Sequence, residues 1–232
     1  MPHDGARILV LGRGRTGSLV ARIAAERGNT VQVLGAAENA GAQALTPTLL
    51  GEVDVVIDFT TPEAVPANLR AALRHGARVV VGTTGWYSEL PEMEQIALAH
   101  GGTLLHGTNF SLGVQAFFRA ARELVRGLHG ATLAIDETHH VTKKDAPSGT
   151  ALTLQRVVER ASGLSAPITS HREGDAAGLH TLKVQLPHET VILTHESASR
   201  DSFAMGAVRA AEWLVDQPAG VWDFAEVATR LG

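Results

Sequence analysis

The segment from Glu137 to Thr150 holds the densest group of residues that could do chemistry. It contains the adjacent histidines His139 and His140, lysines at 143 and 144, and the tripeptide Ser-Gly-Thr at 148–150. If a helix begins at this tripeptide, its free backbone N–H groups and positive potential favour an anion. A lysine nearby adds a point charge, and a histidine or lysine beside a bound anion can donate the proton that a reduction needs. We predict an anion-binding catalytic site, against the alternative of a basic surface loop.

We predict no metal ion at these histidines. Successive residues of an extended chain point to opposite sides, which separates the rings of His139 and His140. The chain also has no cysteine, so thiolate metal sites, iron–sulfur clusters, disulfides and cysteine nucleophiles are excluded.

The glycines Gly12, Gly14 and Gly17 form the pattern Gly-x-Gly-x-x-Gly between an apolar run at 7–11 and an alanine-rich amphipathic stretch. A dinucleotide-binding fingerprint occupies this place, after a strand and at the start of a helix. Glycine allows the tight turn and the close approach of a pyrophosphate, which the helix N-terminus then binds. We predict that this turn binds NADH or NADPH; the alternative is a structural glycine turn.

Charged residues near this turn bear on the choice of cofactor. Glu38 lies a few residues beyond the second expected strand, where a carboxylate can accept hydrogen bonds from the free 2′-hydroxyl of NADH. Arg13 and Arg15 lie inside the glycine loop, where either could meet the 2′-phosphate of NADPH. These features oppose one another, so the sequence leaves NADH against NADPH open.

Further polar turns follow the expected strands. The segments 58–63 and 82–85 stand at the carboxyl ends of two apolar runs, the edge where open α/β sheets bind ligands. Asn109-Phe110-Ser111 follows another run, and each of these segments could instead be a simple turn that caps the next helix. A glycine-rich segment at 172–180 could shape the site. From residue type alone we expect Arg200 to lie on the surface and Phe203 to lie in the core.

The elements that position these residues fall into two groups. Up to Asn109, short apolar runs alternate with helical stretches, which predicts an α/β, Rossmann-type domain with a parallel sheet buried on both faces. After Asn109 the pattern predicts helices at 112–128, 150–161 and 202–215, a loop at 138–148 and a short closing tail. Strands of alternating polarity predict an α+β domain with a mixed or antiparallel sheet, at 131–137, 181–186 and 190–195.

Composition excludes several classes of protein. The 232 residues carry a net charge of −4, with 20 Lys and Arg against 24 Asp and Glu, so we expect no nucleic-acid partner. No apolar run approaches the roughly 18 residues of a membrane span. The first residues lead almost directly into an apolar run, so we expect no signal peptide and a cytoplasmic location.

The sequence resembles the 4-hydroxy-tetrahydrodipicolinate reductase (dihydrodipicolinate reductase) family over essentially its whole length. The stretch 137–151 carries the resemblance most specifically, as Glu-x-His-His-x-x-Lys-x-Asp-Ala-Pro-Ser-Gly-Thr-Ala. Motifs at 58–63, 82–85, 109–113, 172–180 and 199–207 match in the same order. The chain departs from the family in a glycine loop shortened by one residue, with Thr16 where Met is usual. The pair of an acidic and a basic residue that the family has after the second strand has only a loose match at residues 35–39. The segment at 161–172 is also shorter than in longer relatives.

The resemblance implies an NAD(P)H-dependent oxidoreductase that reduces 4-hydroxy-tetrahydrodipicolinate to tetrahydrodipicolinate in the diaminopimelate route to lysine. It implies a Rossmann domain of residues 1–110 with 204–232, a substrate-binding and oligomerisation domain of residues 111–203, and a homotetramer. Two alternatives remain open: another Rossmann reductase of an amino-acid-derived acid, such as an aspartate dehydrogenase, or a non-catalytic NAD(P)H-binding sensor. A silent sensor has no need of a proton donor beside an anion site.

The resemblance also assigns roles to individual residues. It implies that His139 and Lys143 are the proton-donor pair and that His140, Ser148, Gly149 and Thr150 bind the substrate. Together with the motifs above it gives a cofactor site that consists of Gly12, Arg13, Gly14, Arg15, Thr16, Gly17, Glu38, Phe59, Gly82, Thr83, Thr84, Gly107, Thr108, Asn109, Phe110, Arg200 and Phe203.

Overall fold

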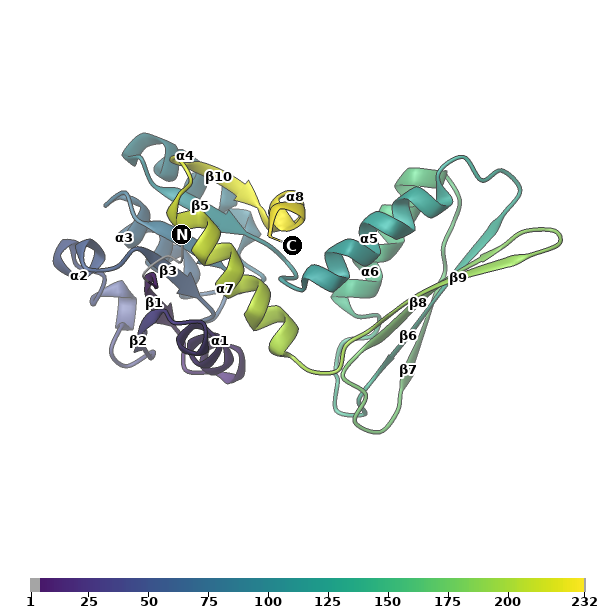
Figure 1. Cartoon of the computed structure of the whole chain (residues 1–232), viewed down its shortest axis with the longest axis horizontal. Coiled ribbons are helices and arrows are strands. Elements are labelled where there is room, and N and C mark those ends of the chain that lie inside the picture. The colour runs from purple at the N-terminus through teal and green to yellow at the C-terminus, as the bar shows by residue number, and fades with distance from the viewer. Residues whose placement is uncertain (1–4, 232) are drawn as a thin grey trace. The chain divides into compact units, whose positions relative to one another are not determined.

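The computed structural model describes residues 5–231, which form two compact units (Figure 1). Unit 1 comprises the described residues up to Leu112 together with those from Asp201 onward, and unit 2 spans Gly113–Arg200. Unit 1 is therefore discontinuous in sequence, because unit 2 is inserted between its two parts. No helix of the described residues is long and apolar enough to cross a bilayer.

Unit 1 is built on a six-stranded parallel sheet in the order β10-β5-β4-β3-β1-β2. Short runs of Val, Ile and Leu favour strands, and successive residues point to opposite faces. In the first strand, Ile8 and Val10 join the core on one face while Leu9 and Leu11 join the core on the other. Both faces are thus buried. The strands are β1 (Arg7–Leu11), β2 (Thr30–Leu34), β3 (Val55–Asp58), β4 (Arg78–Val81), β5 (Thr103–His106) and β10 (Gly220–Asp223).

Helices cover both faces of this sheet. The first core contains residues of α1 and α7, and the second contains residues of α3 and α4. Helix α7 thus returns from a distant part of the sequence, and its Gly206 lies so close to the Phe110 carbonyl that any Cβ would overlap it. The helices are α1 (Arg15–Glu26), α2 (Pro47–Gly51), α3 (Val65–Leu73), α4 (Leu90–His100), α7 (Asp201–Val215) and α8 (Phe224–Val227).

Unit 2 combines a four-stranded sheet with two helices. The strand order is β7-β6-β8-β9, in which β6 and β7 are parallel and the other neighbours are antiparallel. Its core joins Leu133, Ile135 and Leu182 of the sheet to Phe117 and Leu154 of the helices. The elements are α5 (Leu112–Val125), β6 (Thr132–His139), α6 (Gly149–Ser162), β7 (Ile168–Arg172), β8 (Leu179–Gln185) and β9 (Thr190–Glu196).

The predicted fold class, a Rossmann-type parallel sheet together with a second, mixed sheet, is confirmed. The sequence does not predict β7 or α2, which lie where only loops are expected. It also does not predict β10 and α8, which lie in the predicted tail. Both missed strands are short, lie at the edge of a sheet and are partly exposed, so their apolar pattern is weak. Strand β6 also runs beyond its predicted end at 137, so that His139 belongs to the strand and not to the loop.

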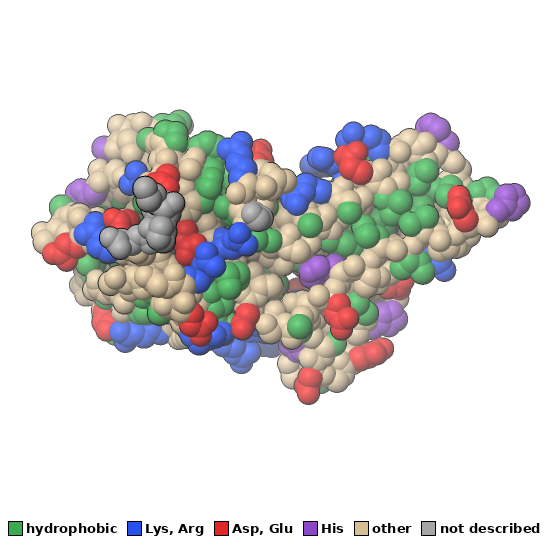
Figure 2. All heavy atoms as spheres, in the orientation of Figure 1, with side chains coloured by type: hydrophobic (Ala, Val, Ile, Leu, Met, Phe, Trp, Pro, Cys, Tyr) green, Lys and Arg blue, Asp and Glu red, His purple; other side chains and the backbone are tan. Residues whose placement is uncertain are grey.

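The surface carries mixed charge. In the view of Figure 2, lysine and arginine side chains lie interspersed with aspartate and glutamate side chains. This agrees with the small net charge of −4. Positive potential for an anionic ligand must therefore come from a local arrangement of groups.

Candidate active site

Strand β6 brings two polar side chains onto the face of the sheet that the helices cover. Residues 133, 135, 137 and 139 alternate toward this face, so Glu137 and His139 continue a buried apolar row. Glu137 is fully buried and His139 is 7% exposed. His140 follows the strand, and its Nδ1 lies 2.7 Å from the hydroxyl of Thr142. The two adjacent histidines therefore have different partners.

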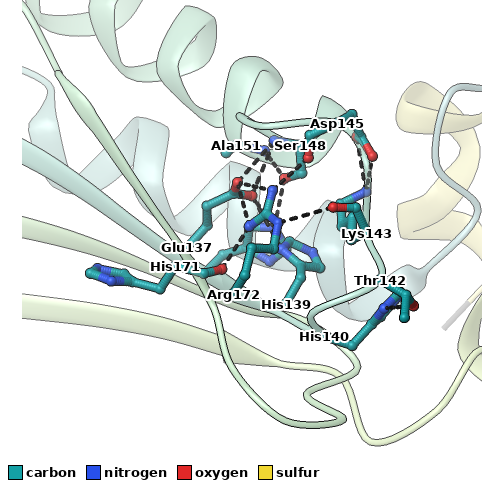
Figure 3. A network of polar contacts seen from close by, with 11 residues as sticks. Glu137, His139, His140, Thr142, Lys143, Asp145, Ser148, Ala151, His171 and Arg172 are labelled. Carbon is teal, nitrogen blue, oxygen red and sulfur yellow. Dashed lines mark hydrogen bonds and ion pairs between the residues drawn. The ribbon is translucent and has the colours of Figure 1, made fainter.

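Glu137 lies at the centre of the polar network in Figure 3. Its carboxylate accepts hydrogen bonds from the backbone N–H of Ser148 at 3.0 and 3.2 Å and from the guanidinium of Arg172 at 3.3 and 3.4 Å. His139 Nδ1 lies 3.3 Å from the same carboxylate. Burial raises the pKa of Glu137. Hydrogen bonds from Ser148 and Ser170, together with the charge of His139, outweigh this effect and hold the pKa below its ordinary value. Glu137 is thus a buried group that remains charged.

Ser148 begins helix α6 and holds its first turn. The Ser148 hydroxyl accepts a hydrogen bond from the Ala151 N–H at 3.2 Å, which is the geometry of an N-cap, and it lies 3.3 Å from His180 Nε2. Apart from the chain neighbours of Gly149 and the backbone of its own helix, no described atom lies within 4 Å of the place where a Cβ would stand at this residue. The start of the helix can therefore receive an anion at the predicted position.

The two adjacent lysines lie in different environments. The ammonium of Lys143 contacts both carboxylate oxygens of Asp145, at 2.7 and 2.8 Å, and its side chain is 21% exposed. Lys144 is exposed. Of the two, Lys143 is the lysine that belongs to the network in Figure 3.

The buried histidines of this network are neutral near pH 7. Burial lowers the pKa of His139; Glu137 opposes this effect, and the positive charges of Lys143 and Arg172 reinforce it. Burial likewise lowers the pKa of His180, to about 4. At neutral pH the positive charges of the network therefore reside on Lys143 and Arg172.

Ligand atoms of Glu137, His139 and His180 lie within 4.8 Å of one another, a spacing that a metal ion could bridge. The sequence predicts no metal, and the charges around these atoms oppose one. The guanidinium of Arg172 lies 3.3 Å from the Glu137 carboxylate and already compensates its charge. The carboxylate therefore needs no metal cation for charge balance.

In unit 1 the glycine turn between β1 and α1 has the geometry of a dinucleotide site. Gly12 has φ +106°, and a Cβ there would lie 2.2 Å from the Phe59 carbonyl. A Cβ at Gly17 would lie 2.1 Å from the Gly12 carbonyl, so neither position admits a side chain. At Gly14 the corresponding place is open, and this residue begins α1 without a side-chain cap. A pyrophosphate can therefore approach the N–H groups of the helix.

Two hollows adjoin the glycine turn and share Gly14, Phe59 and Thr60 among their lining residues. They have volumes of about 330 and 380 Å³. Their linings bring together many predicted cofactor residues, and this set fits a nicotinamide dinucleotide. The first hollow is lined by Gly12, Arg13, Gly14 and Phe59, and the second by Gly14, Arg15, Thr16, Phe59, Gly82, Thr83 and Thr84, together with other residues.

Glu38 is held beside the first hollow by two contacts. Its carboxylate accepts a hydrogen bond from the Gly35 N–H at 2.6 Å and forms an ion pair of 2.8 Å with Arg13. The backbone hydrogen bond from Gly35 is the main cause that lowers the pKa of Glu38, and Arg13 adds to it. Glu38, which favours NADH, is thus in direct contact with Arg13, which favours NADPH.

A buried chain of polar side chains connects the residues around both hollows, and the sequence does not predict its pairings. The carboxylate of Asp58, fully buried at the end of β3, accepts hydrogen bonds from the Thr60 hydroxyl at 2.6 Å and the Asn68 amide at 2.8 Å. Asn68 in turn accepts one from Asn39 at 2.9 Å. Asn39, Thr60 and Asn68 all line the first hollow. In the sequence, the one feature that indicates this polar chain is Asp58, an aspartate at the end of an apolar strand.

Some predicted cofactor residues have other surroundings. Phe110 lies near Phe59, with ring centroids 6.3 Å apart, and packs on Phe224. Arg200 is exposed in unit 2, and Phe203 is half-buried at the start of α7 rather than a core residue. The cofactor roles of these residues stay predictions. The predicted residues that line neither hollow are Gly17, Glu38, Gly107, Thr108, Asn109, Phe110, Arg200 and Phe203.

Both parts of the chain match a described family. The model of the dihydrodipicolinate reductase N-terminus matches residues 6–110, and that of the dihydrodipicolinate reductase C-terminus matches residues 113–228. The 4-hydroxy-tetrahydrodipicolinate reductase of Natronomonas pharaonis is 37% identical over 94% of this chain and 98% of its own. That of Christiangramia forsetii is 36% identical over 78% of this chain and 81% of its own.

A solved structure agrees with these matches in fold. The dipicolinate-bound dihydrodipicolinate reductase from Paenisporosarcina sp. TG-14 has a TM-score of 0.76 to this chain at 22% identity. The similarity covers 94% of this chain and 97% of that one. The chain therefore belongs to the 4-hydroxy-tetrahydrodipicolinate reductase family and is an NAD(P)H-dependent oxidoreductase that reduces 4-hydroxy-tetrahydrodipicolinate in lysine biosynthesis.

Proposed function

We propose that the chain performs this reduction with Lys143 as the proton donor and the start of α6 as the site for a substrate carboxylate. One arrangement carries the proposal: Lys143 and the helix start at Ser148 lie at the two ends of one short loop. The Lys143 carbonyl accepts a hydrogen bond from Arg172, and the Ser148 N–H donates one to Glu137. The substrate is a dianion. Helix N–H groups and one ammonium supply local positive potential for it without a basic protein surface.

The reaction eliminates the hydroxyl group of the cyclic substrate together with one ring hydrogen as water, and it adds a hydride and a proton to the ring. The glycine turn at residues 12–17 would hold NADH or NADPH, which when bound would supply the hydride. The ammonium of Lys143, now paired with Asp145, exchanges this partner for a substrate carboxylate and transfers one proton to the reduced ring. Water then returns the proton to the amine, because the side chain is partly exposed.

We assign His139 a role different from the one that the resemblance implies. Burial lowers the pKa of His139, which disfavours its imidazolium form at pH 7. We therefore assign the proton transfer to Lys143. We propose that His139 and His140 contact the substrate, as do Ser148, Gly149 and Thr150 at the helix start.

The decisive experiment is the oxidation of NADH and of NADPH with freshly generated cyclic substrate. We expect rapid loss of the reduced cofactor that depends on the substrate. Turnover of another amino-acid-derived acid and none of the cyclic substrate would favour a different Rossmann reductase. Cofactor binding without any oxidation would favour a sensor.

We also propose that the chain forms a homotetramer through the sheet of unit 2. The helices cover one face of this sheet, and the other face carries exposed Thr132, Lys183, Ile192, Thr194 and Glu196. Ile192 is 62% exposed, and a second copy of the same flat face would cover it. Light scattering at micromolar concentration should give a tetramer, and Ile192→Lys should shift it toward smaller species. A clean monomer of the unaltered chain would contradict the proposal.

We propose further that the protein works in the cytoplasm, where its cofactor is available in reduced form. The proposal is supported by its membership of a biosynthetic enzyme family. Fractionation of the source cells should recover it in the cytoplasmic fraction. Recovery outside the cytoplasm would refute this location.

A further inference from the structure

Arg172, the last residue of β7, joins separate parts of the active site through one side chain. Its Nε donates to the Lys143 carbonyl at 3.4 Å, and its Nη2 donates to the Asp145 carbonyl. Both Nη atoms also contact the Glu137 carboxylate, at 3.3 and 3.4 Å. The parallel register of β6 and β7 sets Arg172 beside His139. The guanidinium lies between Glu137 and the loop that carries Lys143 and Asp145 (Figure 3).

Glu137 extends this chain of contacts to the other end of the loop. Its carboxylate accepts hydrogen bonds from the backbone N–H of Ser148, the residue that caps α6. The contacts thus run from the carbonyls of Lys143 and Asp145, through Arg172 and Glu137, to Ser148. They hold the backbone at the end that bears the proton donor and at the end that begins the anion site.

The pair is well placed to fix a geometry. Glu137 is fully buried, and the Arg172 side chain is 20% exposed. The next residue is also fixed, because the Glu173 N–H donates to the His139 carbonyl at 2.9 Å. A planar guanidinium has donors in several set directions and can serve two carbonyls and a carboxylate together, whereas an ammonium is a single point charge.

We propose that Arg172 and Glu137 are positioning residues that set where the Lys143 ammonium lies relative to the start of α6. The inference rests on the function proposed above for Lys143. Neither positioning residue needs to touch the substrate. The variant Arg172→Lys keeps a positive charge beside Glu137 but loses the fork of donors. We expect it to lower kcat about 10- to 100-fold, since misplacing a catalytic group by about 1 Å costs on the order of 10²-fold.

A double-mutant cycle with Lys143→Ala tests whether Arg172 acts through Lys143. If it does, adding Arg172→Lys to Lys143→Ala changes kcat by no more than about twofold, because the group that Arg172 positions is already gone. The dissociation constant of NADH should not change. Arg156→Lys, on the exposed side of α6, is the matched control and should keep the kcat of the unaltered chain. Effects that multiply in the double variant, or a normal kcat in Arg172→Lys, would overturn the inference.

Hydrogen exchange at the Ser148 amide provides a readout that does not depend on turnover. With the Arg172–Glu137 contact weakened, exchange at Ser148 should become about tenfold faster in Arg172→Lys and stay unchanged in Arg156→Lys. An unaltered chain without turnover would contradict the proposed function alone, whereas unchanged exchange at Ser148 would contradict the positioning role. If Arg172→Lys does not fold, Glu137→Gln takes its place in both experiments with the same expected outcomes.

Discussion

Arg13 and Glu38 form an ion pair of 2.8 Å beside the hollow at the glycine turn. An acid at this place favours NADH, because it accepts a hydrogen bond from the 2′-hydroxyl and repels a 2′-phosphate. An arginine favours NADPH, because it binds the 2′-phosphate. In the pair each charge compensates the other. Both side chains are substantially exposed, at 58% and 43%, so either can turn toward a cofactor. The pairing makes the choice of cofactor a balance of two neighbouring charges.

We predict that the chain uses both cofactors, with a preference below about tenfold, which corresponds to about 1.4 kcal/mol. Glu38→Gln should raise kcat/KM for NADPH relative to NADH, and Arg13→Gln should lower it, each by about tenfold. Steady-state kinetics with both cofactors measures these ratios. Thermal stability should change little, because exposed ion pairs contribute little to it. A hundredfold preference in the unaltered chain would show that one charge does not reach the cofactor.

Replacement of Lys143 should impair both chemistry and substrate binding. Lys143→Ala removes a general acid, which typically costs about 10²- to 10⁴-fold in kcat. It also removes a positive charge from a substrate carboxylate, so the KM for substrate should rise. The dissociation constant of NADH should hardly change, since the glycine turn lies in the other unit. Steady-state kinetics and NADH fluorescence titration measure these quantities.

The neighbouring lysine supplies the control for this experiment. Lys144 is exposed, so Lys144→Ala should leave both kcat and KM near their values in the unaltered chain. The reverse result, with Lys144→Ala crippling and Lys143→Ala mild, would mean that the residue roles are assigned in the wrong register from His139 to Thr150.

Thr150 should affect binding more than chemistry. Thr150→Val removes one hydroxyl next to the open place at Gly149 and leaves Lys143 and Asp145 in place. A hydrogen bond to a charged group contributes about 1.5–3 kcal/mol, so the KM for substrate should rise about tenfold or more with kcat little changed. A large fall in kcat at unchanged KM would place Thr150 in the chemical step instead.

The stability of unit 2 should fall as the pH falls from about 6.5 to about 4. In the folded state the pKa of His180 is about 4, below the ordinary 6.5. Between these values the unfolded chain binds a proton that the folded chain does not, so protonation favours unfolding. The full effect is about 3 kcal/mol, and about 2 kcal/mol of it is lost by pH 5. Above pH 6.5 this contribution is constant.

Hydrogen exchange in β6 and β8 is the suitable probe, because all tryptophans and the single tyrosine lie in unit 1. His180→Gln should flatten the pH dependence, whatever its effect on stability at pH 7. His171→Gln is the control, since that side chain is 44% exposed. An equal pH dependence in His180→Gln and in the unaltered chain would contradict the prediction.

The sequence predicts those parts of the site that are local in the chain. The turn at Gly12–Gly17 and the helix start at Ser148 depend on neighbouring residues, whose types set the backbone conformation. The alternation along β6 likewise separates His139 from His140. The parallel sheet follows from a regular succession of apolar runs and helices.

The parts that escape prediction depend on residues distant in sequence. Arg172 reaches Glu137 across 35 positions, from a short edge strand with little apolar signal. Asn39 meets Asn68 across 29 positions, inside a hollow that no single segment defines. The neutrality of His139 is a property of burial, which residue types alone do not give.

The insertion of unit 2 within unit 1 has a consequence for synthesis on the ribosome. The core of unit 1 includes Ala204, Val208 and Leu214 of α7 and Phe224 and Leu231 beyond it, all of which follow unit 2 in the sequence. Residues 113–200 leave the ribosome before them and contain nearly all the apolar contacts of unit 2. Unit 2 can thus complete its core from one continuous segment, whereas the core around strands β1–β5 also needs residues that emerge later. A nascent chain that has emerged from the ribosome only as far as residue 200 would hold all the residues of the core of unit 2 but an incomplete core of unit 1.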